Sequence, residues 1–190
     1  MSRGRLVLAS ASPRRKALLE AACFEVDVRA PHVDESWPGD SAESDAIAVA
    51  RRKLDKIGVG QDPVVAADTL VMMGERRFGK PVDRRDAERM LRELSGRRHD
   101  VVTGFCVARG AARALGAVTT GVWFRRLADA EIDLYVGSPE PYDKAGGYAI
   151  QGGAAAFIDR IEGSFTNVMG LPMSEVLAAL AEVGASGPES

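Results

Sequence analysis

The residues best suited to phosphate chemistry come early in the chain, in the segment Ser10-Ala11-Ser12-Pro13-Arg14-Arg15. A serine cap at Ser12, with proline at the next position, is typical of a helix start. Helix N-termini offer unpaired N–H donors and a positive dipole end, so the hydroxyl of Ser10 and the guanidiniums of Arg14 and Arg15 could surround a bound phosphate there. An ordinary capped helix with solvated arginines is the alternative. Cations in a first turn oppose the helix dipole, however, and favour a nearby anion.

A lysine stands on the apolar stripe of the second expected helix. That helix runs from a cap at Ser41 through Ile57, and Lys53 falls among its apolar positions, whereas the other cations of the helix do not. Such a lysine either snorkels to water, which is the commoner outcome, or meets an anion in a cleft.

Two carboxylate positions could serve as a base or as metal ligands. Asp68 interrupts the apolar stretch from Val64 to Met73, which is therefore expected to be a strand broken at Asp68-Thr69. A partly buried carboxylate needs a cation, a metal or hydrogen-bond donors, so the position favours a functional role over a carboxylate that satisfies a turn N–H. The loop pair Asp34-Glu35 could share a divalent cation, although loop acids are more often solvated.

The segment from Gly74 to Pro81 fits the phosphate-loop pattern G-x-x-x-x-G-K up to its last position. There Pro81 replaces the Ser or Thr whose hydroxyl would hold Mg²⁺. We therefore interpret the segment as a turn between strands that delivers Lys80, which could still contact phosphate as a point charge.

Four glycines surround Lys, Tyr and Gln side chains between Asp143 and Gly153. Glycines permit close backbone approach to a ligand, and Gln151 offers paired donor and acceptor groups that could read the edge of a base. A tight structural turn explains the glycines but does not require Gln151. The only histidines, His32 and His99, are interpreted as surface or strand residues rather than as a triad base or zinc ligands.

The elements that must position these residues alternate between short apolar strands and helical periods, which indicates an α/β domain. Strands are expected at residues 6–9, 64–73, 101–108, 119–127 and 156–161, and helices from Pro13, over 41–57, from Asp83 to a stop at Ser95-Gly96, over 131–136 and from Pro172 toward Val183.

Length and composition indicate one folded domain. With 190 residues, 46% of them hydrophobic, the chain can bury a core without disulfides or structural metal. The net charge of −2 lacks the broad basic field that binding to a nucleic acid polymer requires. A folded domain over residues 1–184 and a frayed tail over 185–190 are expected.

The sequence also predicts where the protein resides. Cys23 and Cys106 lie in apolar runs without metal-ligand spacing, so both are expected to be buried and reduced. The apolar run at Leu6–Ala9 is too short for a signal peptide, and no stretch is apolar enough to span a membrane. A cytoplasmic protein without membrane contact is expected.

Several of these motifs, in this order, resemble the Maf family of septum-formation-inhibitor-like nucleotide pyrophosphatases. The likeness runs from about Leu6 to Leu180. The matching segments are Leu8-Ala9-Ser10-Ala11-Ser12-Pro13-Arg14-Arg15, Ala67-Asp68-Thr69, Gly79-Lys80-Pro81, Leu94-Ser95-Gly96, Asp143-Lys144-Ala145-Gly146, Ile150-Gln151-Gly152 and Gly170-Leu171-Pro172. The resemblance implies a single elongated α/β domain, similar to inosine triphosphate pyrophosphatases, with a mixed central sheet flanked by helices and a substrate cleft. It also implies metal-dependent hydrolysis of a nucleoside triphosphate to monophosphate and pyrophosphate.

Three positions indicate the branch within the family. One branch, which acts on 7-methyl-GTP, carries Trp, Gln and Glu where this sequence has Arg14, Thr69 and Gln151. The branch that acts on dTTP and UTP has the residues seen here. The resemblance therefore implies a house-cleaning hydrolase for dTTP, UTP or modified pyrimidine nucleotides.

The residue chemistry agrees with that implication, because anhydride hydrolysis needs positioned cations and an oriented water. Ser10, Arg14, Arg15, Lys53 and Lys80 are expected to hold the triphosphate, and Thr69 and Gln151 to help select the base. Asp68 is expected to act as general base or metal ligand, with Glu35 helping to place Mg²⁺ or Mn²⁺.

Two alternatives belong to other classes. A kinase or ATPase built on Lys80 would release ADP or orthophosphate instead of pyrophosphate. A non-enzymatic regulator of septum formation and cell division would act through protein contacts, so an inactive Asp68 variant would still arrest division. A homodimer is implied by the resemblance alone.

Overall fold

The computed structural model describes residues 4–37, 39 and 41–185. Its strands are β1 (Arg5–Leu8), β2 (Glu25–Val28), β3 (Val64–Met73), β4 (Arg76–Phe78), β5 (Arg98–Arg109), β6 (Ala112–Phe124) and β7 (Ile158–Glu162). Its helices are α1 (Pro13–Ala21), α2 (Ala42–Ile57), α3 (Arg84–Leu94), α4 (Asp129–Val136), α5 (Phe165–Val168) and α6 (Met173–Glu182), with short 3-10 helices η1 (Glu140–Asp143), η2 (Ala145–Gly147) and η3 (Gly153–Phe157).

The strands form one mixed sheet in the order β2-β1-β3-β5-β6-β7, with β4 paired to β3, so the expected mixed sheet flanked by helices is confirmed. Strand β1 runs parallel to β2 and β3, whereas the β3–β4 and β6–β7 pairs are antiparallel. The described residues divide into two compact units. Unit 1 contains the residues up to Asp68, Thr103–Val118 and the residues from Gly170 onward. Unit 2 contains Thr69–Val102 and Thr119–Met169. The helices in the described part of the chain are each too short or too polar to cross a membrane.

The helix starts expected from capping residues are confirmed. Ser12 precedes α1 and its hydroxyl accepts from the Arg15 N–H, and Ser41 forms a capping box with Ser44 at the start of α2. Asp83 caps α3 by accepting from the N–H of Asp86. Each cap satisfies an N–H group that has no partner within its helix.

Several details differ from the sequence expectations. Strand β3 continues through Asp68 without a break, because the Asp68 carboxylate has a cationic partner, Lys53, on helix α2. Strand β2 and helix α5 were not expected; each spans four residues, too few to show a clear period. Strand β5 extends beyond both of its expected ends, and β6 begins seven residues earlier and ends three residues earlier than expected, with the hairpin turn at Gly110, where φ is +57°.

The two cysteines differ in exposure. Cys106 is buried as expected, but Cys23 is exposed, so that expectation was wrong. Cys23 lies just beyond the end of α1, where the chain reverses with φ of +67° and its side chain points away from the core that Phe24 enters. Of the expected C-terminal tail, residues 186–190 lie outside the described residues.

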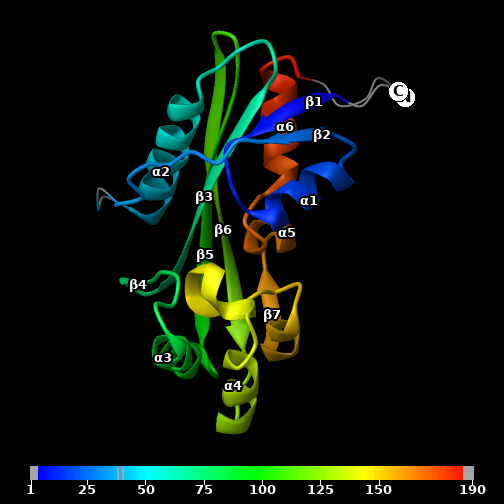
Figure 1. Ribbon diagram of the computed structural model, residues 1–190. Coiled ribbons are helices and arrows are strands. Elements are labelled where there is room, and N and C mark those ends of the chain that lie inside the picture. Colours follow the sequence, from blue (N-terminus) through cyan, green and yellow to red (C-terminus); the bar gives the residue numbers. More distant parts are fainter. Residues whose placement is uncertain (1–3, 38, 40, 186–190) are drawn as a thin grey trace. The chain divides into compact units, whose positions relative to one another are not determined.

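Unit 1 has helices on both faces of its strands. Alternate strand residues enter two separate cores, which is the period-two pattern of a sheet buried on both sides. One core joins Leu6, Leu8, Val65 and Ala67 to α1 and α6, and the other joins Val7, Ala9, Val64 and Ala66 to α2. Figure 1 shows α2 on one side of β1 and β3, with α1 and α6 on the other.

Helix α2 lies unusually close to β5. A Cβ atom added at Gly104 would stand 2.3 Å from the carbonyl carbon of Ala46 and from the nitrogen of Ile47. Only glycine allows this backbone-to-backbone contact. The contact fixes the depth at which α2 packs, and so the position of the side chains that α2 turns toward the sheet.

The core of unit 2 joins α3 and α4 to the strands and contains a buried histidine. His99 is 1% exposed, its Nε2 lies 2.7 Å from the Tyr148 hydroxyl oxygen, and its ring packs edge-on against Phe124 and Tyr148. Burial, together with the nearby positive charge of Arg98, lowers the pKa of His99 from 6.5 to about 3. The expectation of a strand histidine is confirmed.

This histidine predicts a specific acid sensitivity. Because the folded-state pKa lies below the unfolded value, the unfolded chain binds more protons between about pH 6.5 and pH 3, and stability is lost as the pH falls through that window. The loss is roughly 1.4 kcal/mol per pH unit, or about 2 kcal/mol at pH 5. Urea unfolding at pH 7 and pH 5 should show a loss about 2 kcal/mol larger for the wild type than for His99→Gln.

The matched control is His32→Gln, which removes an exposed histidine. Titration of carboxylates is common to all three proteins and cancels in the comparison. An identical pH dependence in the wild type and His99→Gln would show that His99 does not remain neutral in the folded protein.

Candidate active site

The centre of the site is a buried ammonium group between two carboxylates. Lys53 of α2 is 7% exposed, and its Nζ lies 2.8 Å from Asp68 Oδ1 and 2.7 Å from Glu35 Oε1. The lysine therefore meets anions inside the protein and does not snorkel to water, so the commoner outcome was the wrong one here. Asp68 is also buried, with 9% of its surface exposed.

Strand alternation explains why Asp68 faces Lys53. Val64 and Ala66 enter the core beneath α2, and Asp68 is the next residue of the same parity in β3. On the α2 side, Lys53 is one residue before Leu54, which lies in that same core. The ammonium compensates the cost of burying the Asp68 carboxylate.

Glu35 is held beside Lys53 by a structured loop. The Asp34 carboxylate accepts from the Ser36 N–H at 2.8 Å and from the Ser36 hydroxyl at 2.7 Å, bonds that lower the pKa of Asp34. Arg52 donates to the carbonyl oxygens of Asp34 and, at 2.7 Å, of Ser36, the two residues that flank Glu35. Asp34 thus shapes the turn while Glu35 carries the ion pair. The sequence did not predict that Arg52 would hold this loop. Its place next to Lys53 in the sequence was the one feature that could have indicated this role.

Arg15 is the buried cation at the start of α1. Its Nε donates to the Gly170 carbonyl oxygen at 2.7 Å and one terminal nitrogen donates to Ser10 Oγ at 3.0 Å. Burial lowers the pKa of Arg15, while the negative charges of Asp68 and Glu35 act in the opposite direction. Arg14, half-buried, is its neighbour in the first turn of the helix. Gly170 belongs to one of the matching family segments, but the role of its carbonyl oxygen was not predicted, because every residue carries a carbonyl.

Unit 1 therefore brings together Ser10, Arg15, Glu35, Lys53 and Asp68. Arg14 also belongs to unit 1, whereas the remaining expected residues, Thr69, Lys80 and Gln151, belong to unit 2. Thr69 follows Asp68 in β3, and Lys80 is exposed two residues after β4. Met73 pairs with Arg76 across the β3–β4 turn, so the expected turn between strands is confirmed, and the segment is not a phosphate loop. Gln151 is exposed in a turn closed by the Gly152 N–H and the Ala149 carbonyl oxygen.

The donor set can be tested for a metal. Within the described ranges, no group of three or more His, Cys, Asp or Glu side chains could enclose an ion. The pair Glu35 and Asp68 offers hard oxygen ligands around one cation position, now filled by the Lys53 ammonium. Mg²⁺ is usually bound by one or two carboxylates together with substrate phosphates, so these residues fit a cation that arrives with a phosphate ligand.

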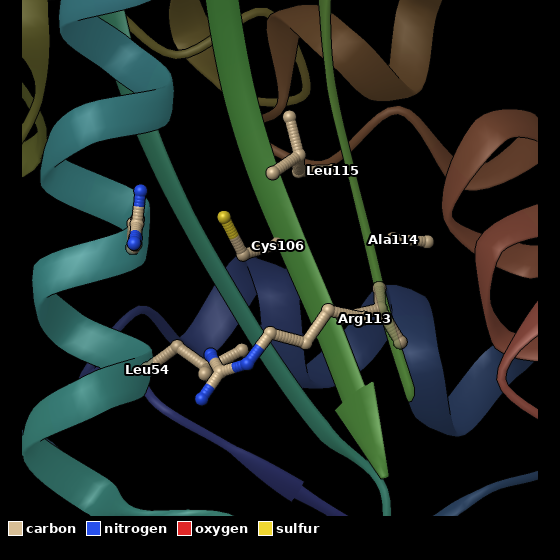
Figure 2. Close-up of a pocket in the computed structure, with 7 residues that line it drawn as sticks. Leu54, Cys106, Arg113, Ala114 and Leu115 are labelled. Atoms are coloured by element: carbon tan, nitrogen blue, oxygen red, sulfur yellow. The ribbon is translucent and has the colours of Figure 1, made fainter. Parts of the chain in front are cut away.

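A pocket of about 210 Å³ in unit 1 contains none of the expected site residues. Leu54 and Cys106 are among the residues that line it. Figure 2 shows the Arg113 side chain extending from β6 toward α2. Its guanidinium donates to the Asp55 carboxylate of that helix at 3.0 Å. Burial raises the pKa of the Cys106 thiol to about 11. Because the thiol stays protonated near neutral pH, this pocket offers no nucleophile.

The site therefore lies in an α/β protein and combines the buried cations Lys53 and Arg15 with the carboxylates of Asp68 and Glu35. A family model described as "Maf-like protein" matches residues 5–183. This chain belongs to the Maf family, as its motifs predicted.

Relatives cover nearly the whole chain. A protein from Anaeromyxobacter dehalogenans (strain 2CP-C) is 50% identical over 186 residues, which are 95% of this chain and 94% of that protein. One from Geobacter sulfurreducens is 47% identical over 190 residues, covering 97% of this chain and all of that protein. Both are named dTTP/UTP pyrophosphatase. Among solved structures, the Staphylococcus aureus Ham1 protein is 17% identical with a TM-score of 0.43, covering 66% of this chain and 72% of that one.

Proposed function

We propose that this protein hydrolyses dTTP and UTP to the nucleoside monophosphate and pyrophosphate. The observation that carries the proposal is the buried Lys53 ammonium between Asp68 and Glu35, with Arg15 close enough to interact with both carboxylates. The names of the relatives support the substrate. Because the match covers 94% or more of each of those relatives, their reaction is extended to this chain.

Cations bind and orient the triphosphate. Arg15 contributes a guanidinium already fixed by the Gly170 carbonyl and Ser10, so little side-chain entropy is lost when it meets a phosphate. Arg14 and the N–H groups of the first turn of α1 add donors at the positive end of the helix dipole. Lys53 and Lys80 complete the proposed phosphate-binding set as point charges.

Asp68 takes part in the bond-breaking step. A water oxygen forms a bond to the α-phosphorus, the bond from that phosphorus to the bridging oxygen breaks, and pyrophosphate leaves. The Asp68 carboxylate accepts the proton that the water loses. Its contact with the Lys53 ammonium, 2.8 Å away, holds the carboxylate in place for this role.

Glu35 and Asp68 are the residues that would hold a divalent cation, Mg²⁺ or Mn²⁺. When bound, such an ion neutralises phosphate charge and stabilises the developing charge on the leaving group. Glu35 is half exposed, with 53% of its side-chain surface accessible, so it can leave Lys53 for an incoming cation at little cost.

Base selection is assigned to Arg14, Thr69 and Gln151. Each has hydrogen-bonding groups, and Gln151 has both a donor and an acceptor for the edge of a pyrimidine. A wrong base leaves such groups unpaired, which discriminates strongly. The homodimer that the resemblance implies remains a prediction.

The test is pyrophosphate release from dTTP, UTP, CTP, dCTP, ATP, GTP and 7-methyl-GTP with Mg²⁺ or Mn²⁺. We expect dTTP and UTP to be cleaved at least about tenfold faster than the other nucleotides, because a mismatched base leaves polar groups unpaired. EDTA should lower the rate at least about tenfold, because the phosphate charge then lacks its counterion.

The products distinguish this proposal from others. ADP or orthophosphate without pyrophosphate would indicate a kinase or ATPase. A preference for 7-methyl-GTP would preserve the reaction but contradict the roles of Arg14, Thr69 and Gln151. No pyrophosphate from any nucleotide would contradict the proposal itself.

A further inference from the structure

The turn that carries Gln151 is fixed by side chains from α4 and η1, all within unit 2. Tyr148, Ala149 and Ile150 are buried, whereas Gln151 is exposed at the point where the chain reverses. The single backbone bond across the turn, from the Gly152 N–H to the Ala149 carbonyl oxygen, is 3.1 Å long. A lone bond of this kind does not fix a glycine-rich segment, so further contacts must hold it.

Two side chains supply those contacts. The Tyr135 hydroxyl of α4 accepts from the Ala149 N–H at 3.1 Å and donates to Glu140 Oε1 at 2.7 Å. The other carboxylate oxygen, Glu140 Oε2, accepts from the Gly153 N–H at 3.2 Å. Tyr135 and Glu140 thus grip the backbone two residues before and two residues after Gln151. We call this pair the Tyr135–Glu140 clamp.

The clamp is itself rigid. Tyr135 is 7% exposed, and its ring packs edge-on against Phe157 with 5.1 Å between centroids. Glu140 begins η1, where the Ser138 hydroxyl accepts from its N–H and its carbonyl oxygen accepts from Lys144 Nζ at 2.6 Å. A side chain with its backbone bonded on both sides has few alternative positions.

The glycine next to Gln151 provides the space for this carboxylate. A Cβ atom added at Gly152 would stand 2.2 Å from Glu140 Oε2 and 2.5 Å from its Cδ. Any larger residue would therefore displace the Glu140 side chain. The backbone of Gly152, with φ of −115°, is open to any residue type, so the turn itself does not require glycine there. The space taken by the Glu140 carboxylate explains the glycine instead.

We propose that Tyr135 and Glu140 are positioning residues that set base selectivity by fixing the Gln151 turn. The inference rests on the proposed function, in which Gln151 reads the base. Neither residue needs to touch the substrate: the clamp limits the positions that the Gln151 amide can take. Without it, the same amide would adapt to more than one base edge, and the penalty for the wrong base would shrink.

The main test compares the wild type with Tyr135→Phe for dTTP and dCTP. The variant keeps the buried ring and removes one oxygen, which leaves the Ala149 N–H and Glu140 Oε1 without this partner. We expect the ratio of kcat/KM for dTTP to that for dCTP to fall about five- to tenfold. The change should appear mainly as a higher KM for dTTP, with kcat within about twofold, because the groups around Asp68 are unaltered.

The matched control is Tyr142→Phe. The Tyr142 hydroxyl donates to the Val136 carbonyl oxygen at 2.7 Å and has no bond to the Gln151 turn, so this variant loses a comparable hydrogen bond without touching the clamp. We expect its selectivity to match the wild type. Gly152→Ala, which pushes Glu140 aside, should reproduce the effect of Tyr135→Phe.

The outcomes separate the two proposals. A wild type that releases no pyrophosphate from dTTP overturns the proposed function and this inference together. An active wild type whose selectivity survives in folded Tyr135→Phe and Gly152→Ala overturns the inference alone. The same holds if both variants lose kcat equally for both nucleotides, since that result would indicate a general structural role. Thermal unfolding identifies any variant that fails to fold, and the remaining variant then decides.

Discussion

Replacing Asp68 by Asn is expected to lower kcat for dTTP by roughly 10³-fold, because loss of a general base typically costs 10²- to 10⁴-fold. The amide has nearly the same shape, and its oxygen can still accept from Lys53, so the local packing is preserved. It can neither take a proton from water nor contribute a negative charge to hold a cation. KM for dTTP should change little. Steady-state pyrophosphate release, with a circular dichroism spectrum to show an intact fold, measures both parts of the expectation.

The control for this variant is Asp27→Asn. Asp27 is also a strand aspartate in unit 1, and its carboxylate accepts two bonds from Arg29, at 2.7 and 3.0 Å, which lower its pKa. Asp27 lies in β2 and is not one of the predicted site residues. Loss of its charge should change kcat by no more than about twofold. A folded Asp68→Asn protein that retains more than about a tenth of wild-type kcat would contradict the catalytic assignment.

The part of the site that sequence could predict depends on local patterns. Ser12 and Pro13 marked the start of α1 because capping requires only neighbours in the chain. The alternation of β3 places Asp68 on the face that Lys53 meets, and the position of Lys53 on an apolar stripe placed it toward the sheet. These local periods picked out Asp68 and Lys53 as candidates one by one, and the resemblance to the Maf family joined them in one expected site.

The rest could not be predicted because it depends on contacts between distant segments. The bond from Arg15 to the Gly170 carbonyl links residues 155 positions apart, and any carbonyl could have served. The short strand β2 owes its existence to pairing with β1, since its four residues have little apolar character of their own. The Tyr135–Glu140 clamp likewise joins α4 to the Gln151 turn through side chains whose types suit many surface positions.

Charge balance around Lys53 connects stability with activity. The ammonium neutralises Asp68 in the absence of substrate, and the same ammonium would bind phosphate when substrate arrives. A buried pair of this kind gains little over an apolar pair, but removing one partner leaves an uncompensated charge. Removal of the cation is therefore costly, and a variant of Lys53 should show this cost in the free energy of unfolding as well as in turnover.

Replacing Lys53 by Met is expected to lower the free energy of unfolding by about 3 kcal/mol, the size seen when a buried ion pair loses one member. Met retains the apolar stem, so the loss reflects the Asp68 carboxylate, 9% exposed, left without its cation. Turnover of dTTP should fall about 100-fold, because one phosphate-binding charge is lost in the transition state. Urea unfolding and pyrophosphate release measure the two effects. Lys56→Met, on an exposed position of the same helix, should change stability by no more than about 0.5 kcal/mol.

The double variant Lys53→Met, Asp68→Asn separates charge from packing. In the single variant Asp68→Asn the new amide oxygen still accepts from Lys53, so the cost should be about 1 kcal/mol. In the double variant no buried charge is stranded, since Glu35 is half exposed, and the total loss should be about 2 kcal/mol smaller than the sum of the single losses, within the range found for contacting residues. Activity should stay at the level of Asp68→Asn or below, because neither the base nor the phosphate-binding charge is restored. Strictly additive losses would contradict the coupling, since they would mean that each charge is solvated independently of the other.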